Sequence, residues 1–273
     1  MSVRVTSEPA EFQATTFGFL QADPVLHTVL LGNVAERAAG TRPVEAEASY
    51  FVSVHDAGGE VIGAAMRTPG RPVFLGALRA DLAAEVADAF TGLTPDASGV
   101  SGDRAAVHAF AERWGGVTAA ESKGSRLHKL EKLVPLPATG KARPMGSGDV
   151  QLAAEWVSDG FREEFKSPDV AWAEHHLERG TLLIWEDDGE PVSMAGFHLP
   201  LFGVCRVGPV YTPPKYRRHG YAGALTGAVS AKILADGNQA CLYTDLANPT
   251  SNKIYAQLGY RPVADFVDLT FRR

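Results

Sequence analysis

Residues 210–229 read VYTPPKYRRHGYAGALTGAV and contain an abrupt change of pattern. The stretch overlaps CRVGPVYT at 205–212, whose β-branched and small residues predict a buried strand. Pro213 and Pro214 end this strand, because proline cannot donate a hydrogen bond to a ladder. From Tyr221 onward, apolar residues recur at helical spacing. The segment between the prolines and this helix is therefore a strand-to-helix junction.

Three cations lie in this junction, Lys215, Arg217 and Arg218, although the chain has a net charge of -6. The first amides of a helix lack partners and carry the positive end of the helix dipole. Gly220 and Ala222 leave the backbone open to close approach. The pattern predicts a site for phosphate or pyrophosphate. A glycine turn with solvated arginines is the alternative from spacing alone, since short glycine motifs are weakly specific.

A second pattern lies at 242–262, LYTDLANPTSNKIYAQLGYRP, which predicts a strand, a turn and a short helix. Asn248 suits the N-cap and Gly259 the position past the helix end. Three side chains share one helix face at spacing i, i+4 and i+7: Asn248, Asn252 and Tyr255. Asn248 could equally be only a cap, and Tyr255 only an amphipathic residue of the helix surface.

The two patterns together resemble the GNAT superfamily of N-acetyltransferases. Arg217-x-x-Gly220-x-Ala222, after Val210-x-Thr212-x-Pro214, resembles its acyl-CoA motif, and the segment from Asn248 through Tyr255 to Leu258-Gly259-Tyr260 resembles its second motif. The resemblance covers 181–262 well and 142–180 loosely. It implies that backbone amides at 218–222 hold the pyrophosphate of acetyl-CoA. The cofactor-binding residues that it implies are Val210, Thr212, Arg217, Arg218, His219, Gly220, Tyr221, Ala222, Asn248 and Asn252.

The same resemblance implies direct transfer of an acetyl group to a primary amine, with Tyr255 as general acid toward the departing thiolate. An amine is mostly protonated at pH 7, so a base is needed. The base candidates are Glu163, Glu164, His198 and Asp245. Each also has a structural interpretation: the two glutamates as a solvated helix face, the histidine as a packed side chain, and the aspartate as a turn residue.

The chain divides into two similar halves at a Pro- and Gly-rich stretch, 133–148. Residues 50–69 align with 181–200, each reading as a hairpin, and helices at corresponding places follow. We expect an α+β fold of two tandem GNAT-like domains, each with a mostly antiparallel central sheet and flanking helices. The expected domains are 1–138, a degenerate copy, and 139–273, the catalytic copy.

The first half lacks the residues that carry the chemistry of the second. It has no Arg-x-x-Gly-x-Ala after its third predicted strand. When Gly115 is aligned with Gly259, Ala111 stands opposite Tyr255 and His108 opposite Asn252. We expect this half to shape the acceptor cleft or the contact between the domains.

Composition limits the other possibilities. No segment has the roughly 18 consecutive apolar residues of a membrane span, and the N-terminus lacks the apolar core of a signal peptide. Cys205 and Cys241 have no zinc-type spacing, and the adjacent His175 and His176 diverge on a helix, so no metal is expected. The acidic balance argues against nucleic-acid binding. We expect a cytoplasmic monomer or homodimer.

Two other functions compete with acetyl transfer. The chain could be an amino-acid N-acyltransferase that uses a longer acyl-CoA. It could also be a non-catalytic acyl-CoA-binding or regulatory module, although binding alone does not require Tyr255.

Overall fold

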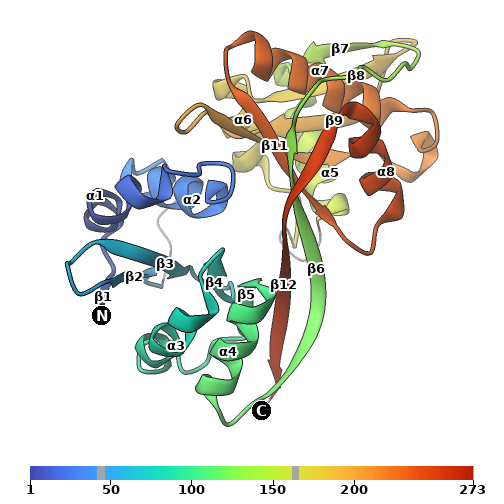
Figure 1. The fold of residues 1–273 in the computed structure, drawn as a ribbon. Helices are drawn as coiled ribbons and strands as arrows, with labels where there is room; N and C mark the ends of the chain where they lie inside the picture. The colour runs from blue at the N-terminus through green and yellow to red at the C-terminus, as the bar shows by residue number, and fades with distance from the viewer. Residues whose placement is uncertain (42–46, 162–165, 273) are drawn as a thin grey trace. The chain divides into compact units, whose positions relative to one another are not determined.

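The computed structural model describes residues 1–41, 47–161 and 166–272, and it has a mixed α/β architecture (Figure 1). The chain forms two compact units. Unit 1 comprises Met1–Leu127, Thr244–Asn248 and Pro262–Arg273, and unit 2 comprises His128–Tyr243 and Pro249–Arg261. Each unit thus includes a segment from the other half of the sequence. The predicted domains 1–138 and 139–273 follow the sequence repeat instead, and that boundary stays a prediction.

Unit 2 contains most of the second half. Its elements in chain order are β7 (Lys141–Pro144), η2 (Ser147–Asp149), α5 (Val150–Gly160), α6 (Val170–Arg179), β8 (Leu182–Asp187), β9 (Glu190–Phe197), β10 (Val204–Tyr211), η3 (Pro214–Tyr216), α7 (Tyr221–Ala235), β11 (Gln239–Asp245, whose last two residues belong to unit 1) and α8 (Pro249–Leu258). β7, β8, β9 and β10 pair antiparallel in sequence order, and β10 pairs parallel with β11.

Unit 1 repeats this order. Its elements are β1 (Ser2–Thr6), α1 (Pro9–Leu20), α2 (Thr28–Ala38), β2 (Tyr50–His55), β3 (Val61–Arg67), β4 (Val73–Gly76), η1 (Ala80–Leu82), α3 (Ala83–Thr91), β5 (Gly99–Asp103), α4 (Arg104–Trp114) and most of β6 (Thr118–Leu130). Strands β1 to β4 pair antiparallel and β4 pairs parallel with β5. The predicted duplication and the predicted fold class, with mostly antiparallel pairing, are confirmed.

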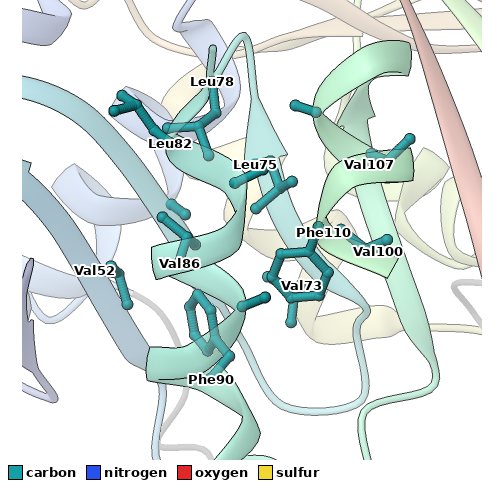
Figure 2. Packing of buried hydrophobic residues seen from close by; sticks show 14 of the residues in the cluster. Val52, Val73, Leu75, Leu78, Leu82, Val86, Phe90, Val100, Val107 and Phe110 are labelled. Atoms are coloured by element: carbon teal, nitrogen blue, oxygen red, sulfur yellow. The ribbon is translucent and has the colours of Figure 1, made fainter. Parts of the chain in front are cut away.

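The last strand of the chain, β12 (Tyr260–Arg272), completes the sheet of unit 1. It pairs antiparallel with β5, from Phe266 opposite Asp103 to Thr270 opposite Gly99. Its side chains Val267 and Leu269 join the core of that unit, where helices α3 and α4 pack on the strands (Figure 2). The second half of the sequence thus supplies a core strand to unit 1.

The sheet of unit 2 has a separate core on each face. Successive side chains of a strand point to opposite faces, so on β9 Ala195 joins the core under α7 and Met194 the core under α5 and α6. The C-terminal half of α8 packs on the same side as α7. The stretch 133–148, predicted as a linker, contains β7, and its Leu136 packs against the core under α7.

Glycines on α7 set its distance from α8. A Cβ at Gly223 would lie 3.3 Å from Cγ2 of Ile254, and one at Gly227 would lie 3.3 Å from Cδ2 of Leu258. Both contacts are tighter than ordinary van der Waals spacing, so a side chain larger than hydrogen would push the helices apart. The small-residue pattern of α7 therefore fixes where α8 lies.

Gly259, directly after α8, generates the first testable prediction. Its φ is +99°, and a Cβ there would lie 1.8 Å from the carbonyl oxygen of Lys132. Gly237 is a matched control, because its φ is +78° and a Cβ would meet no atom within 4 Å. We expect Gly237→Ala to cost roughly the 1–2 kcal/mol of a left-handed residue, and Gly259→Ala to cost at least twice as much. Urea denaturation measures both, and equal losses would contradict the packing described.

Candidate functional site

The site begins where β10 and β11 separate. Their parallel register runs from Val204 opposite Gln239 to Val207 opposite Leu242, and among the described residues it ends there, although β10 continues to Tyr211. The register of β10 with β9 also shifts between Val207 and Val210, which marks a bulge. The end of β10 is thus bent away from the regular ladder, just before the cationic turn.

Side-chain hydrogen bonds hold the start of this turn in place. The Thr212 hydroxyl lies 2.8 Å from the hydroxyl of Ser193, which is fully buried on β9. The Thr212 carbonyl accepts a hydrogen bond of 3.0 Å from Nε of Arg217. Nδ1 of His219 lies 2.9 Å from the Arg217 carbonyl oxygen, and its ring stacks on Tyr221. The turn is therefore braced along its length.

Two residues of the turn have left-handed backbone conformations, Arg218 with φ +72° and Gly220 with φ +87°. Left-handed residues in a turn direct successive amides into one concavity, which is a common anion-binding arrangement. Residues 217–220 are exposed, and α7 begins immediately after them with 15 residues. Within the described ranges, neither Arg217 nor Arg218 has a carboxylate partner. Exposed amides, the helix dipole and two arginines without a described carboxylate partner make this turn a candidate anion site.

The Tyr221 side chain points away from this concavity. Tyr221 is buried, and its hydroxyl donates to the carboxylate of Asp187 at the end of β8. That hydrogen bond lowers the pKa of Asp187 and raises the pKa of Tyr221. A second hydrogen bond, from Thr139, lowers the pKa of Asp187 further and opposes the rise in the pKa of Tyr221. Only the backbone amide of Tyr221 remains available to a ligand. The sequence did not indicate the role of Asp187, which reads there as part of an acidic hairpin turn.

Helix α8 places the predicted acid beside α7. Tyr255 is half-buried, and its ring meets that of Tyr260 edge-on at 6.1 Å. Burial raises the pKa of Tyr255 to about 12, and the neighbouring Thr226 hydroxyl opposes this shift. Asn252 is also half-buried and lies one turn earlier on α8. Asn248 immediately precedes α8 and is exposed.

The second half of the chain can now be compared with known proteins. The sequence of residues 150–260 matches the family model described as "Acetyltransferase (GNAT) family". This stretch contains β10, the cationic turn, α7 and α8. Residues 150–260 form a GNAT acetyltransferase domain. The matched family consists of acetyltransferases, which indicates that this domain is an acyltransferase. No curated protein sequence matches the chain.

Solved structures show the GNAT fold over nearly the whole chain. A GNAT-family acetyltransferase from Colwellia psychrerythraea aligns with a TM-score of 0.67 at 11% identity and covers 100% of both chains. A GCN5-related N-acetyltransferase from Sphaerobacter thermophilus aligns with a TM-score of 0.64 at 16% identity, and the alignment covers 98% of this chain and 94% of that one. A tandem GNAT protein from the clavulanic acid biosynthesis pathway aligns with a TM-score of 0.59 at 13% identity, and the alignment covers 98% of both chains. The tandem GNAT fold is thereby confirmed.

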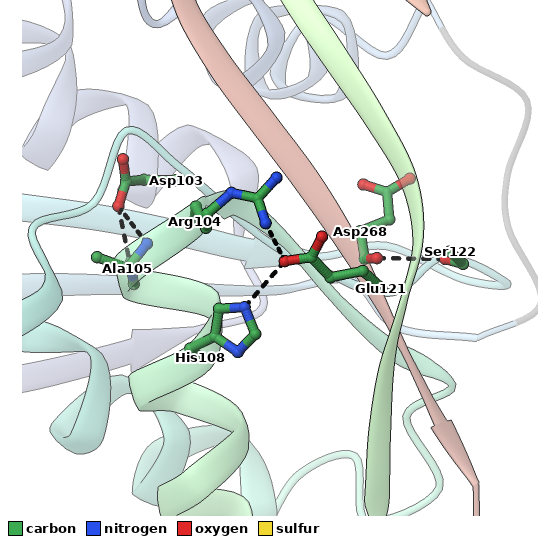
Figure 3. Close-up of polar contacts among 8 residues, drawn as sticks. Asp103, Arg104, Ala105, His108, Glu121, Ser122 and Asp268 are labelled. Carbon is green, nitrogen blue, oxygen red and sulfur yellow. Dashed lines mark hydrogen bonds and ion pairs between the residues drawn. The ribbon is translucent and has the colours of Figure 1, made fainter. Parts of the chain in front are cut away.

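The first GNAT-like copy uses the positions of the second motif for structure. On α4, Asp103 caps the helix by accepting from the amides of Ala105 and Ala106 (Figure 3). His108, which aligns with Asn252, lies with Nε2 3.1 Å from the Glu121 carboxylate, which also pairs with Arg104 (Figure 3). This exposed cluster ties α4 to β6 within unit 1. His108 therefore has its partner, Glu121, within unit 1.

The base candidates of the GNAT domain differ in their surroundings. Nε2 of His198 lies 2.9 Å from the Arg206 guanidinium and accepts its hydrogen bond, so that lone pair is engaged. One carboxylate oxygen of Asp245 accepts a hydrogen bond of 2.7 Å from the Ala247 amide, so this side chain stabilises the turn before α8. Glu163 and Glu164 lie outside the described residues.

A cavity elsewhere in unit 2 lies away from the predicted site. A cavity of about 390 Å³ in unit 2 is lined by Lys232, Ile233 and Asp236, at the opposite end of α7 from the cationic turn, and no predicted cofactor-binding residue lines it. In the described part of the chain, no group of three or more possible metal ligands occurs, and no helix is long and apolar enough to span a membrane.

The hydrogen bond between Tyr221 and Asp187 generates a pH-dependent prediction. In Tyr221→Phe the pKa of Asp187 should rise toward the ordinary value near 3.9, and in Thr139→Val it should rise less, because the Tyr221 bond is the larger cause. A lowered pKa stabilises the folded protein above the unfolded-state value, and this contribution disappears as pH falls through the folded-state pKa. Tyr221→Phe should therefore be less stable at pH 7 and approach the wild type in acid.

Carboxyl-carbon NMR titration measures the pKa of Asp187 in the wild type and both variants. Urea denaturation at pH 7 and near pH 3 gives the accompanying stabilities. An unchanged pKa of Asp187 in Tyr221→Phe would show that the phenol does not hold this carboxylate.

Proposed function

We propose that the GNAT domain is an N-acetyltransferase that moves the acetyl group of acetyl-CoA directly to a primary amine. The observation that carries this proposal is the exposed turn from Arg217 to Gly220, with left-handed residues at 218 and 220 and two guanidinium groups that have no carboxylate partner among the described residues. A pyrophosphate is the ligand that best uses such a concavity at a helix start, because it accepts several amide and guanidinium hydrogen bonds at once.

The rest of the donor fits the elements next to this turn. Val210 lies on the part of β10 beyond the pairing with β11, so its backbone can pair with an extended pantetheine arm in the manner of an added strand. Asn252, on the face of α8 that carries Tyr255, would contact the same arm. We assign Asn248 and Thr212 to this arm as well, the latter through its amide, because its hydroxyl and carbonyl already have partners.

Positioning provides much of the catalysis in direct transfer, because well-oriented reactants gain roughly 7–11 kcal/mol. The amine nitrogen forms a bond to the thioester carbonyl carbon, the C–S bond breaks, and its electron pair leaves on sulfur. A backbone amide of β10 near Val210 stabilises the oxyanion. The proton of the amine passes to a base, for which Glu163, Glu164 and Asp245 stay candidates from the sequence. His198 is less suited, because its Nε2 already accepts from Arg206.

Tyr255 acts on the sulfur of the thioester, and its pKa determines whether it donates a hydrogen bond or transfers a proton. Burial raises the pKa of Tyr255 to about 12, whereas a free thiol titrates near 8.5, so complete proton transfer would cost about 5 kcal/mol. The phenol therefore contributes mainly a hydrogen bond to the sulfur while charge develops, and proton transfer completes late. A hydrogen bond to a charged group contributes roughly 1.5–3 kcal/mol.

The Tyr255 assignment predicts a selective loss of turnover. Tyr255→Phe should lower kcat roughly 10- to 100-fold, as expected for one charged hydrogen bond, and leave the Kd of acetyl-CoA within about threefold. Tyr50→Phe, a half-buried tyrosine of unit 1, is the control. Thiol release from acetyl-CoA with a panel of amines gives kcat, and calorimetry gives Kd. Full turnover in Tyr255→Phe would remove Tyr255 from the chemistry.

The anion site predicts a loss of donor binding when its backbone is covered. Gly220→Val adds a side chain where φ is +87° and a Cβ would lie 3.2 Å from the Pro137 carbonyl oxygen. We expect the affinity for CoA to fall at least 100-fold, since the branched side chain occupies the space of the diphosphate. Gly237→Val, also at positive φ, should bind CoA normally. Calorimetry with unchanged CoA affinity in Gly220→Val would place the diphosphate elsewhere.

A further inference from the structure

Arg206 is a cation on the face of the unit 2 sheet opposite α7. Its neighbours on β10, Cys205 and Val207, both belong to the core under α7, so Arg206 between them points to the other face. Phe197, the last residue of β9, belongs to the same core, and His198 directly after it shares the face of Arg206. The distance of 2.9 Å between His198 Nε2 and Arg206 Nη2 agrees with this placement.

The partners of Arg206 differ from those of two other arginines with limited exposure. Arg143 is held by the carboxylates of Asp149 and Glu186, and Arg67 is held by Glu47. Arg206 is half-buried, yet in the described part of the chain it has no carboxylate partner, only the neutral ring nitrogen of His198. A guanidinium with limited access to water and no anion beside it is a ready binding group for an anionic ligand.

The position of Arg206 connects this group with the reaction. Val207 and Leu242 form the last pair of the parallel ladder. Arg206 directly precedes Val207 on β10, and Tyr243 directly follows Leu242 on β11. Leu242 belongs to the core under α7, so Tyr243 points to the face of Arg206. Burial raises the pKa of Tyr243, and the Arg206 charge opposes this shift, in agreement with their placement on one face. Both therefore flank the point where the strands part, next to which the thioester is proposed to lie.

We infer that Arg206 binds a carboxylate of the acceptor, so that the amine substrate is an amino acid or another amine with a nearby carboxylate. This inference rests on the proposed acetyl transfer. His198 is a positioning residue here, because its Nε2 accepts from the guanidinium and fixes its orientation. A bidentate guanidinium–carboxylate contact holds a planar anion in one orientation, which would aim an α-amino group at the neighbouring thioester.

The test compares L-amino acids with their carboxamides as acceptors, using thiol release from acetyl-CoA. We expect the wild type to prefer the acids by at least tenfold in kcat/KM. Arg206→Gln should remove this preference, and Arg206→Lys should keep part of it, because a lysine retains the charge without the bidentate geometry. The control is Arg113→Gln, an exposed arginine of unit 1 that pairs with Asp88. Unchanged CoA affinity shows that each variant is folded.

The outcomes separate this inference from the function on which it rests. If neither acids nor amides release thiol, the proposed acetyl transfer is wrong, and calorimetry with the acids in the presence of CoA still tests Arg206. If amides react as well as acids in the wild type, or the preference for acids survives Arg206→Gln, the inference is wrong. His198→Gln should raise KM for the acids with kcat within about twofold. A fall in kcat with unchanged KM would instead make His198 the base.

Discussion

The left-handed turn between β10 and α7 is the constraint on which the site depends. A turn with positive φ at Arg218 and Gly220 directs amides toward solvent at the place where the dipole of α7 is most positive. Such a conformation is costly for arginine, so it must be held by its surroundings. The bond from Arg217 to the Thr212 carbonyl and the bond from Tyr221 to Asp187 hold it at its two ends. The acidic hairpin turn of β8 and β9 thus supports a cationic loop.

Close packing of α8 against α7 positions Tyr255, the second part of the proposed site. Gly223 and Gly227 let α8 lie against α7, and Gly259 lets the chain leave α8 beneath the Lys132 carbonyl. Tyr255 on α8 packs against the core under α7, and burial there raises its pKa. On the opposite face, Arg206 and His198 form a polar pair beside the end of the ladder. The proposed donor and acceptor sites thus lie on two sides of one strand separation.

Local patterns in the sequence predicted the elements well. Alternation and turn residues gave both hairpins, helical spacing gave α3, α4, α7 and α8, and proline and glycine marked the ends of β10 and α8. These features depend on neighbours within a few residues. Two short motifs were sufficient to find the GNAT domain, since their order and separation are specific where each alone is not.

Contacts between distant residues were not predictable in the same way. The strand β12 pairs with β5, which brings Ser101 and Asp268 within a hydrogen bond across 167 positions of sequence, and no local pattern specifies that partner. The inward direction of the Tyr221 side chain depends on Asp187, 34 residues earlier. Arg206 reads in the sequence as one cation in an apolar strand. Its significance emerges only from the absence of a carboxylate beside it in the described residues.

A crystal structure of the protein with CoA tests the central claim most directly. The account predicts diphosphate oxygens within 3.2 Å of backbone amides between Arg218 and Ala222, with at least one of the guanidinium groups of Arg217 and Arg218 turned toward them. A diphosphate bound in unit 1, or in the cavity near Lys232 and Asp236, would contradict it.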